Sequence, residues 1–170
     1  MISSSTIAAV YKGGGVRRFH TLPTVGLDTV ASHSFGVAML VTLLCGGKPR
    51  AEVLIQALKH DLPEAPFGDI PAPAKAYLAK DELLKAEESY MAACGLASED
   101  LTKEEWRTLK LADNLDGLRF CIEEYNKGNR GLLECERNYC RYITDMMLDE
   151  GEELIYNYIL NQRRSNYERQ

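Results

Sequence analysis

Apolar residues in this chain recur at steps of three and four positions along most of its length. In the stretch "TVASHSFGVAMLVTLLC", for example, Val37, Val41 and Leu44 share one face at helical spacing. Strand-like alternation never extends over more than four residues. The pattern predicts an all-α fold, and a length of 170 residues predicts a single domain over residues 1–170 with its core at about 15–150.

Turn and capping residues mark where several of the helices begin and end. A Gly-Gly pair is expected to end the first long helix, and "LTKEEW" is a capping box with Thr102 as N-cap and Glu105 three residues later. The first 28 residues are expected to be mostly irregular, with the glycines at 13–15 in a loop, and residues 161–170 are expected to fray. Helices are predicted over residues 29–45, from Pro49 to about Leu62, over roughly 74–94, from Thr102 to near "NKGNRG", and over 131–149 and 151–164 as one or two helices.

Composition excludes several classes of protein. The net charge of −5 and the pI near 5.3 argue against a protein that coats nucleic acid. No apolar run reaches the ~18–20 residues that a membrane helix needs, and the N-terminus does not read as a signal peptide. The five cysteines form no C-x-x-C pair, which predicts reduced thiols and a cytoplasmic location.

Ionisable side chains interrupt the apolar pattern in three places. His33 and Asp113 each stand where a valine or leucine would be expected. Within "ALKHDLPEAPFGDI", an apolar run is followed directly by His60 and Asp61. An unpaired aspartate in a core costs several kcal/mol unless it binds a metal or a partner. Imidazole nitrogen together with carboxylate oxygen suits a divalent metal with open positions for water or substrate. The set therefore predicts a site for one divalent cation.

Each of these residues also has an ordinary structural explanation. A single histidine on an apolar face is usually a core histidine with its hydrogen bonds satisfied. The dipeptide His60-Asp61 alone is a weak signal, and Asp113 could pair with Lys110 or Arg119 of its own helix. The metal-site hypothesis depends on the whole set and not on any one member.

The order His33, His60-Asp61, Asp113 resembles the metal signature of the HD-domain phosphohydrolases. "HDLPEAPFGDIPAPAK" resembles the family's HDxxE…GD-x-P-x-P-x-K stretch, "ASHSFGVAML" its EHS-x-x-VA helix, and "KLADNLDGL" its K-x-AD-x-L helix. The similarity covers about residues 15–125. Within the family it is closest to the small 5'-deoxynucleotidases and the phage dATP triphosphohydrolases, and "RFHT" favours the latter.

This resemblance implies a helical HD-domain bundle and roles for individual residues. Glu64 would orient or deprotonate the attacking water. Asp69 would accept a hydrogen bond from the sugar 3'-hydroxyl or help to order the site. Phe19, where the 5'-deoxynucleotidases have Trp, would pack against the deoxyribose or base, or would be a core aromatic residue. Arg18 and Lys75 would contact phosphate; the alternative for each is an ordinary surface charge. One divalent ion (Zn, Co, Mn or Mg) would be held by His33, His60, Asp61 and Asp113.

The activity implied is hydrolysis at the α-phosphate, foremost of dATP to deoxyadenosine and triphosphate. Two alternatives stay open: a 5'-deoxynucleotidase specific for monophosphates, and a non-catalytic helical nucleotide-binding or scaffold protein with a structural metal. The resemblance also implies a homo-oligomer, either a dimer or a hexamer, located in the host cytoplasm if the chain is of phage origin. Four apolar residues of the C-terminal helices are expected in either the core or an interface: Leu154, Ile155, Tyr158 and Ile159.

Overall fold

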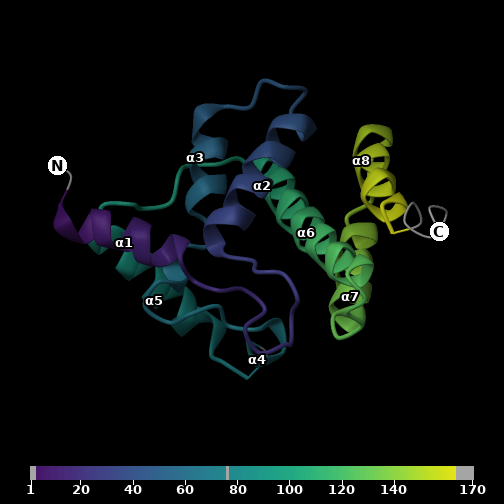
Figure 1. Cartoon of the computed structure of the whole chain (residues 1–170). Helices are drawn as coiled ribbons and strands as arrows, with labels where there is room; N and C mark the ends of the chain where they lie inside the picture. Colours follow the sequence, from purple (N-terminus) through teal and green to yellow (C-terminus); the bar gives the residue numbers. More distant parts are fainter. Residues whose placement is uncertain (1–2, 76, 164–170) are drawn as a thin grey trace.

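The computed structural model describes residues 3–75 and 77–163, and the regular structure within them is helical (Figure 1). Their only extended pairing is a single bridge between Arg17 and Thr29. The all-α prediction is confirmed, and no helix in this part of the chain is both long and apolar enough to cross a bilayer. The elements are α1 (Ser4–Gly14), α2 (Val30–Leu44), α3 (Ala51–Lys59), the 3₁₀ turn η1 (Leu62–Glu64), α4 (Ala72–Lys75), α5 (Lys80–Ala93), α6 (Lys103–Asn126), α7 (Leu133–Asp145) and α8 (Glu150–Asn161).

Helix α6 is the centre of the molecule. It contacts α2 and α3 toward one end and α7 and α8 toward the other, as Figure 1 shows. Leu111, Leu115 and Leu118 of α6 are fully buried between these neighbours, each stabilising the fold by about 1.5–3 kcal/mol. Ile155 and Ile159 of α8 belong to this core, whereas Leu154 and Tyr158 are 72% and 67% exposed. Of the two locations expected for these residues, Ile155 and Ile159 therefore lie in the core.

Helices α2 and α6 both begin after a threonine N-cap. Thr29 caps α2 by accepting a hydrogen bond from the backbone of Ser32, and Thr102 caps α6 in the same way. Helix α2 ends before Gly46 and Gly47, whose φ angles of +62° and +83° are conformations that favour glycine. The predicted cap at Thr102 and the predicted end of α2 at Gly46-Gly47 are confirmed.

The prediction of a mostly irregular N-terminus is confirmed for residues 15–28 and wrong for Ser4–Gly14. Residues Ser4–Gly14 form α1, capped by Ser3. Gly13 lies inside this helix because it packs against η1: a Cβ added there would lie 2.7 Å from Leu62 Cδ2. The glycine run therefore provides a close contact between elements as well as a helix end, which a sequence pattern cannot distinguish.

The helix predicted over residues 74–94 is instead two helices, α4 and α5, which the extended residue Ala79 helps to separate. Asp81 and Glu82 lie in the first turn of α5, where negative charge is favourable next to the helix N-terminus. The C-terminal region likewise forms two helices, α7 and α8. The expected fraying of the tail concerns mainly residues 164–170, which lie outside the described part of the chain.

A loop over residues 15–29 joins α1 to α2 and is fastened to the end of α6. The backbone N–H groups of Val25 and Gly26 donate to the carboxylate of Glu124 at 2.6 and 2.7 Å. Burial alone would raise the pKa of Glu124, but hydrogen bonds from Asn129 and from these backbone groups lower it to about 2. The loop is thereby held at a fixed place beside α6, and it carries Arg18 and Phe19 toward the residues described next.

Candidate metal centre

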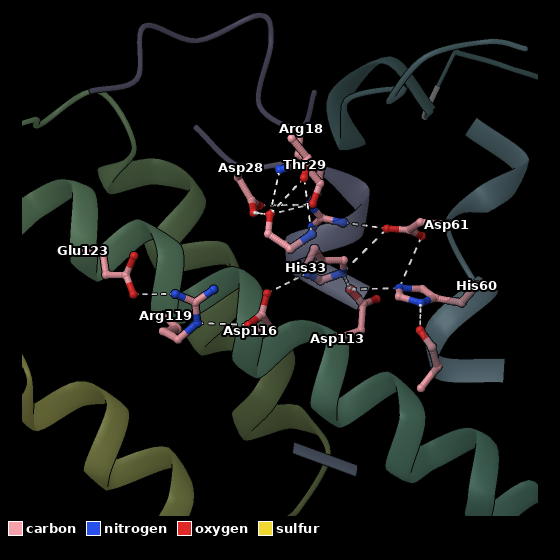
Figure 2. A network of polar contacts seen from close by, with 12 residues as sticks. Arg18, Asp28, Thr29, His33, His60, Asp61, Asp113, Asp116, Arg119 and Glu123 are labelled. Carbon is pink, nitrogen blue, oxygen red and sulfur yellow. Dashed lines mark hydrogen bonds and ion pairs between the residues drawn. The ribbon is translucent and has the colours of Figure 1, made fainter. Parts of the chain in front are cut away.

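Four ionisable side chains from three parts of the chain meet where α2, the end of α3 and α6 come together (Figure 2). His33 comes from α2, His60 and Asp61 follow α3, and Asp113 comes from α6. One possible ligand atom each from His33, His60 and Asp61 lies within 4.8 Å of the others.

Two of the four distances among these atoms, 3.1 and 3.3 Å, equal those between neighbouring ligands of one cation, and the other two, 3.6 and 4.0 Å, are longer. His33 Nε2 lies 3.1 Å from Asp113 Oδ1 and 3.6 Å from Asp61 Oδ2. His60 Nε2 lies 3.3 Å from Asp61 Oδ1 and 4.0 Å from Asp113 Oδ1. Atoms bound at ~2.0–2.2 Å to one metal lie about 3.0–3.4 Å apart when they are neighbours in its coordination shell. Among the described residues, His33, His60 and Asp61 form a group that could hold a metal ion, and Asp113 lies beside it through His33.

The hydrogen bonds of His60 favour the same conclusion. Its Nδ1 lies 2.7 Å from the carbonyl oxygen of Ala57, so Nδ1–H donates there and Nε2 is the nitrogen that faces the cluster. Nε2 is buried and has no hydrogen-bond partner among the described residues. A buried, unpartnered imidazole nitrogen that faces two carboxylates is a group that a cation would satisfy.

His33 is fully buried and lies between two carboxylates of α6. Its Nε2 faces Asp113, and its Nδ1 lies 2.7 Å from Asp116 Oδ2. Burial alone would lower the pKa of His33, but the hydrogen bonds to Asp113 and Asp116 raise it to about 9. The sequence hypothesis did not include Asp116, although its position three residues after Asp113 on the same helix would have indicated it.

Of the two ion pairs considered for Asp113, with Lys110 or with Arg119, the structure contains the first. Lys110 Nζ lies 2.7 Å from Asp113 Oδ2, leaving Oδ1 toward the two histidines. Arg119 pairs with Asp116 instead. Burial alone would raise the pKa of Asp113, but the hydrogen bond from His33 and the charge of Lys110 hold it well below its usual range. A pairing with Lys110 is therefore compatible with a role for Asp113 in the cluster.

Pro63 determines how the chain passes through the site. If α3 continued as an α-helix, the proline ring would clash with the carbonyl of Lys59 and its missing N–H would leave that carbonyl unpaired. Helix α3 accordingly ends at Lys59, earlier than the predicted end near Leu62, and the chain continues as the 3₁₀ turn η1. Side chains three residues apart eclipse one another in a 3₁₀ turn, so Asp61 and Glu64 lie on the same side.

Glu64 is half-buried, and its Oε2 atom is buried without a hydrogen-bond partner among the described residues. Burial, together with the charges of Asp61 and Asp69, raises the pKa of Glu64 to about 8. A carboxyl group with such a pKa can both accept and release a proton near neutral pH.

Arg18 is buried and pairs with two carboxylates. Its Nη1 lies 2.6 Å from Asp61 Oδ2 and its Nε lies 3.2 Å from Asp28 Oδ2. Burial alone would raise the pKa of Asp61, but His60 and Arg18 lower it. In this structure Arg18 thus orients Asp61, a contact that the sequence did not predict; its phosphate contact stays a prediction.

Asp69 and Phe19 contact each other across 50 residues of sequence. The backbone N–H of Phe19 donates to Asp69 Oδ2 at 3.0 Å, and the φ angle of Phe19 is +53°, an uncommon value for a bulky residue. The Phe19 ring stacks on Phe120 with centroids 5.0 Å apart. Of the two expectations for Asp69, this contact favours ordering the site.

Lys75 lies at the exposed end of α4, close enough for its charge to lower the pKa of Glu64. The structure therefore brings Glu64, Arg18, Phe19 and Asp69 around the four-residue cluster and leaves Lys75 at its edge.

A model of the HD domain family matches residues 16–131. The chain belongs to the HD domain family. It is similar to a dATP triphosphohydrolase of Salmonella phage PMBT28, with 34% identity over 126 residues, 64% of this chain and 61% of that relative. It is also similar to a 5'-deoxynucleotidase of Vibrio vulnificus, with 25% identity over 90% of this chain and 89% of the relative.

The fold is that of solved HD-domain structures. The HD phosphohydrolase DatZ of cyanophage S-2L, bound to dA and one catalytic Zn²⁺ ion, superposes with a TM-score of 0.65 and 18% identity over 94% of this chain and 95% of that one. The resemblance inferred from the sequence is confirmed for the family and the fold. HD domains bind a divalent metal, and His33, His60 and Asp61 form a candidate site for it.

Proposed function

We propose that this chain, a metal-dependent hydrolase of the HD domain family, cleaves deoxynucleotides at the α-phosphate, with dATP as its main substrate. The observation that carries the proposal is the cluster of His33, His60, Asp61 and Asp113 beside the unpartnered carboxylate of Glu64. A metal held only for structural reasons would not need a titratable group such as Glu64 next to its ligands.

The four clustered side chains are proposed to hold one divalent ion (Zn, Co, Mn or Mg). The two histidines would present Nε2, since Nδ1 of each faces an oxygen acceptor. When bound, a divalent cation lowers the pKa of water and screens the negative charge of phosphate oxygens.

Glu64 is proposed to orient the attacking water and to take its proton. The 3₁₀ turn places it on the side of Asp61, and its raised pKa of about 8 suits a group that holds a proton for part of the cycle. The water oxygen forms a bond to the α-phosphorus, the bond from phosphorus to the 5'-oxygen breaks, and that oxygen leaves with a proton as the nucleoside.

Substrate contacts are proposed for the loop residues. Arg18 donates to Asp61, so a phosphate oxygen beside Asp61 would lie close to the same guanidinium, and Lys75 would add a second positive charge at the entrance. Phe19, stacked on Phe120, offers an apolar surface for deoxyribose, against which a 2'-hydroxyl would lose its hydration. Asp69 holds Phe19 in place through its backbone N–H and is proposed to accept a hydrogen bond from the 3'-hydroxyl.

A 5'-deoxynucleotidase specific for monophosphates is the second candidate, favoured by the similarity to the Vibrio relative over nearly the full length of both chains. The two activities share the same attack on the α-phosphorus. They differ in the space and positive charge available beyond the α-phosphate.

A nucleotide panel tests the proposal. The purified chain is incubated with dATP, dADP, dAMP and ATP in the presence of Zn²⁺, Co²⁺, Mn²⁺ or Mg²⁺, and products are separated by chromatography. We expect deoxyadenosine and triphosphate from dATP; release from dAMP alone would establish the second candidate. Metal binding without turnover of any nucleotide would establish the non-catalytic alternative.

A substitution in the four-residue cluster tests whether hydrolysis depends on it. Asp61→Ala is expected to lose both metal and hydrolysis, whereas Asp81→Ala in the exposed first turn of α5 serves as a control and should retain both. Wild-type metal content and rate in Asp61→Ala would contradict the assignment.

We also propose a homo-oligomer, as a dimer or hexamer in the cytoplasm. Helix α2 carries no charged residue except the buried His33, yet Phe35, Met39 and Leu43 are 65%, 49% and 61% exposed at four-residue steps. A helix that is apolar on all sides is usually covered on all sides. Light scattering of the wild type and of Met39→Glu tests this: the wild type should be an assembly and the variant smaller, and a monomeric wild type would contradict it.

A further inference from the structure

Asp116 is a buried carboxylate that the proposed reaction does not use. It is 1% exposed, in the middle of α6, where an unpaired charge would be costly. Its Oδ2 lies 2.7 Å from His33 Nδ1, and its Oδ1 accepts from Arg119 Nε at 2.9 Å (Figure 2). Both oxygens therefore have fixed partners, one of which is a residue of the metal cluster.

The space that Asp116 occupies is created by a glycine in the facing helix. A Cβ added to Gly36 of α2 would lie 2.1 Å from Asp116 Oδ1, so no other residue fits at position 36 without displacing the carboxylate. Gly36 has an ordinary helical conformation, and no positive φ angle requires glycine there. The close approach of α2 to the carboxylate is the feature that needs it.

The outer side of Asp116 is held as well. Arg119 pairs with both Asp116 and Glu123 along α6, so its guanidinium cannot turn away freely from Asp116. The chain Glu123, Arg119, Asp116, His33 thus runs from the surface of α6 to the imidazole, as Figure 2 shows.

We propose that Asp116 is a positioning residue that fixes His33 with its proton on Nδ1 and its Nε2 lone pair directed at the cation. The inference rests on the proposed role of His33 in metal binding. Asp113 on one side and Asp116 on the other come from the same helix one turn apart, so a single element sets both the cluster geometry and the orientation of the imidazole. Without Asp116 the ring could rotate or exchange its tautomer and present the wrong nitrogen.

Metal titrations test this without recourse to turnover. Zn²⁺ and Co²⁺ binding are measured on the metal-free wild type, Asp116→Ala, Asp116→Asn and His33→Ala, together with the visible d–d spectrum of the Co²⁺ form. We expect Asp116→Ala to bind about 10- to 100-fold more weakly and to change the Co²⁺ spectrum. Asp116→Asn, which keeps an oxygen acceptor, should lose less affinity than Asp116→Ala.

Gly36→Ala provides an independent variant, because it displaces Asp116 without removing any polar group. Its expected effect is a weakened metal affinity in the direction of Asp116→Ala. Gly14→Ala, also a helical glycine but with its nearest contact, Ala31 Cβ, at an ordinary 3.4 Å, is the matched control and should bind like the wild type. Thermal unfolding of each metal-free variant identifies any that fail to fold, in which case Asp116→Asn and Gly36→Ala decide.

The outcomes separate this inference from the proposed function. Wild-type affinity and an unchanged Co²⁺ spectrum in folded Asp116→Ala and Gly36→Ala, with binding lost in His33→Ala, would overturn the positioning role and leave the metal site intact. If the wild type binds no divalent ion, or if His33→Ala binds as well as the wild type, both fail together.

Discussion

The two sides of the candidate metal centre are built differently. On the helical side, His33 is completely buried and each ring nitrogen faces a carboxylate of α6. On the loop side, His60 Nε2 and Glu64 Oε2 are buried but have no hydrogen-bond partner among the described residues. Fully paired polar groups stabilise a fold, whereas unpaired ones cost free energy unless a ligand satisfies them. The contrast indicates that the helical side maintains the geometry and the loop side carries the reactive groups.

The largest expected effect is on the loop side and on rate alone. Glu64→Gln removes the carboxylate that would take the proton of the attacking water while keeping the shape of the side chain. Hydrolysis should fall by roughly 10²–10⁴. Metal content and thermal stability should stay close to those of the wild type, since Glu64 is not one of the four clustered residues. An undiminished rate in single-turnover measurements would refute the proposed role.

A stability comparison addresses the helical side. His33→Ala leaves Asp113 and Asp116 without their shared partner and should lower the free energy of unfolding of the metal-free chain by about 3–5 kcal/mol. His60→Ala loses one hydrogen bond to a backbone carbonyl and should cost only about 0.5–1.5 kcal/mol beyond the lost packing. Urea unfolding in the presence of a chelator measures both values. Equal losses would show that the two sides do not differ as described.

The pH dependence of metal binding sharpens the same contrast. Because hydrogen bonds to Asp113 and Asp116 raise the pKa of His33 to about 9, the metal-free chain carries a proton there at neutral pH. A cation must displace that proton, so affinity should rise roughly tenfold per pH unit up to about pH 9 and then level off. Calorimetry in buffers of different ionisation enthalpy should detect close to one released proton at pH 7. Affinity that is independent of pH between 6 and 9 would contradict this.

The smallest effect is expected at Asp69, which holds the loop residue Phe19 through a backbone hydrogen bond. Asp69→Ala removes the acceptor of the Phe19 backbone N–H and should destabilise the chain by about 0.5–1.5 kcal/mol. Metal affinity should not change, while the KM for dATP should increase because Phe19 is released from its constrained conformation. A change in metal affinity without one in KM would assign Asp69 to the cluster instead.

Much of the fold was predictable because its signals are local. The capping box at Thr102 is visible in the sequence itself, and apolar residues at steps of three and four positions predict the helices. Helix α1 was missed because Gly13 could mark either a loop or a close packing contact, and only the position of Leu62 distinguishes them. Such a contact depends on tertiary structure that no local pattern contains.

In the candidate site too, residues with a local signal in the sequence could be predicted, whereas contacts that depend on tertiary structure could not. His33 and Asp113 were found because charged groups on apolar faces stand out from their neighbours. Asp116 has the same property, yet the resemblance to a known signature drew attention to Asp113 alone. The contact between Arg18 and Asp61 spans 43 residues of sequence and depends on the path of the loop over residues 15–29, which sequence spacing does not specify.

Helix α6 contributes Asp113 to the cluster, Asp116 to the imidazole and Glu124 to the loop that carries Arg18. All three residues lie on one continuous helix, so the angle between any two of them about the helix axis is set by the number of residues that separates them. Inserting one residue after Asp116 would swing Glu124 through about 100° and detach the loop while the upstream carboxylates stayed in register. Natural variation in chain length among close relatives should consequently accumulate between helices and spare the interior of α6.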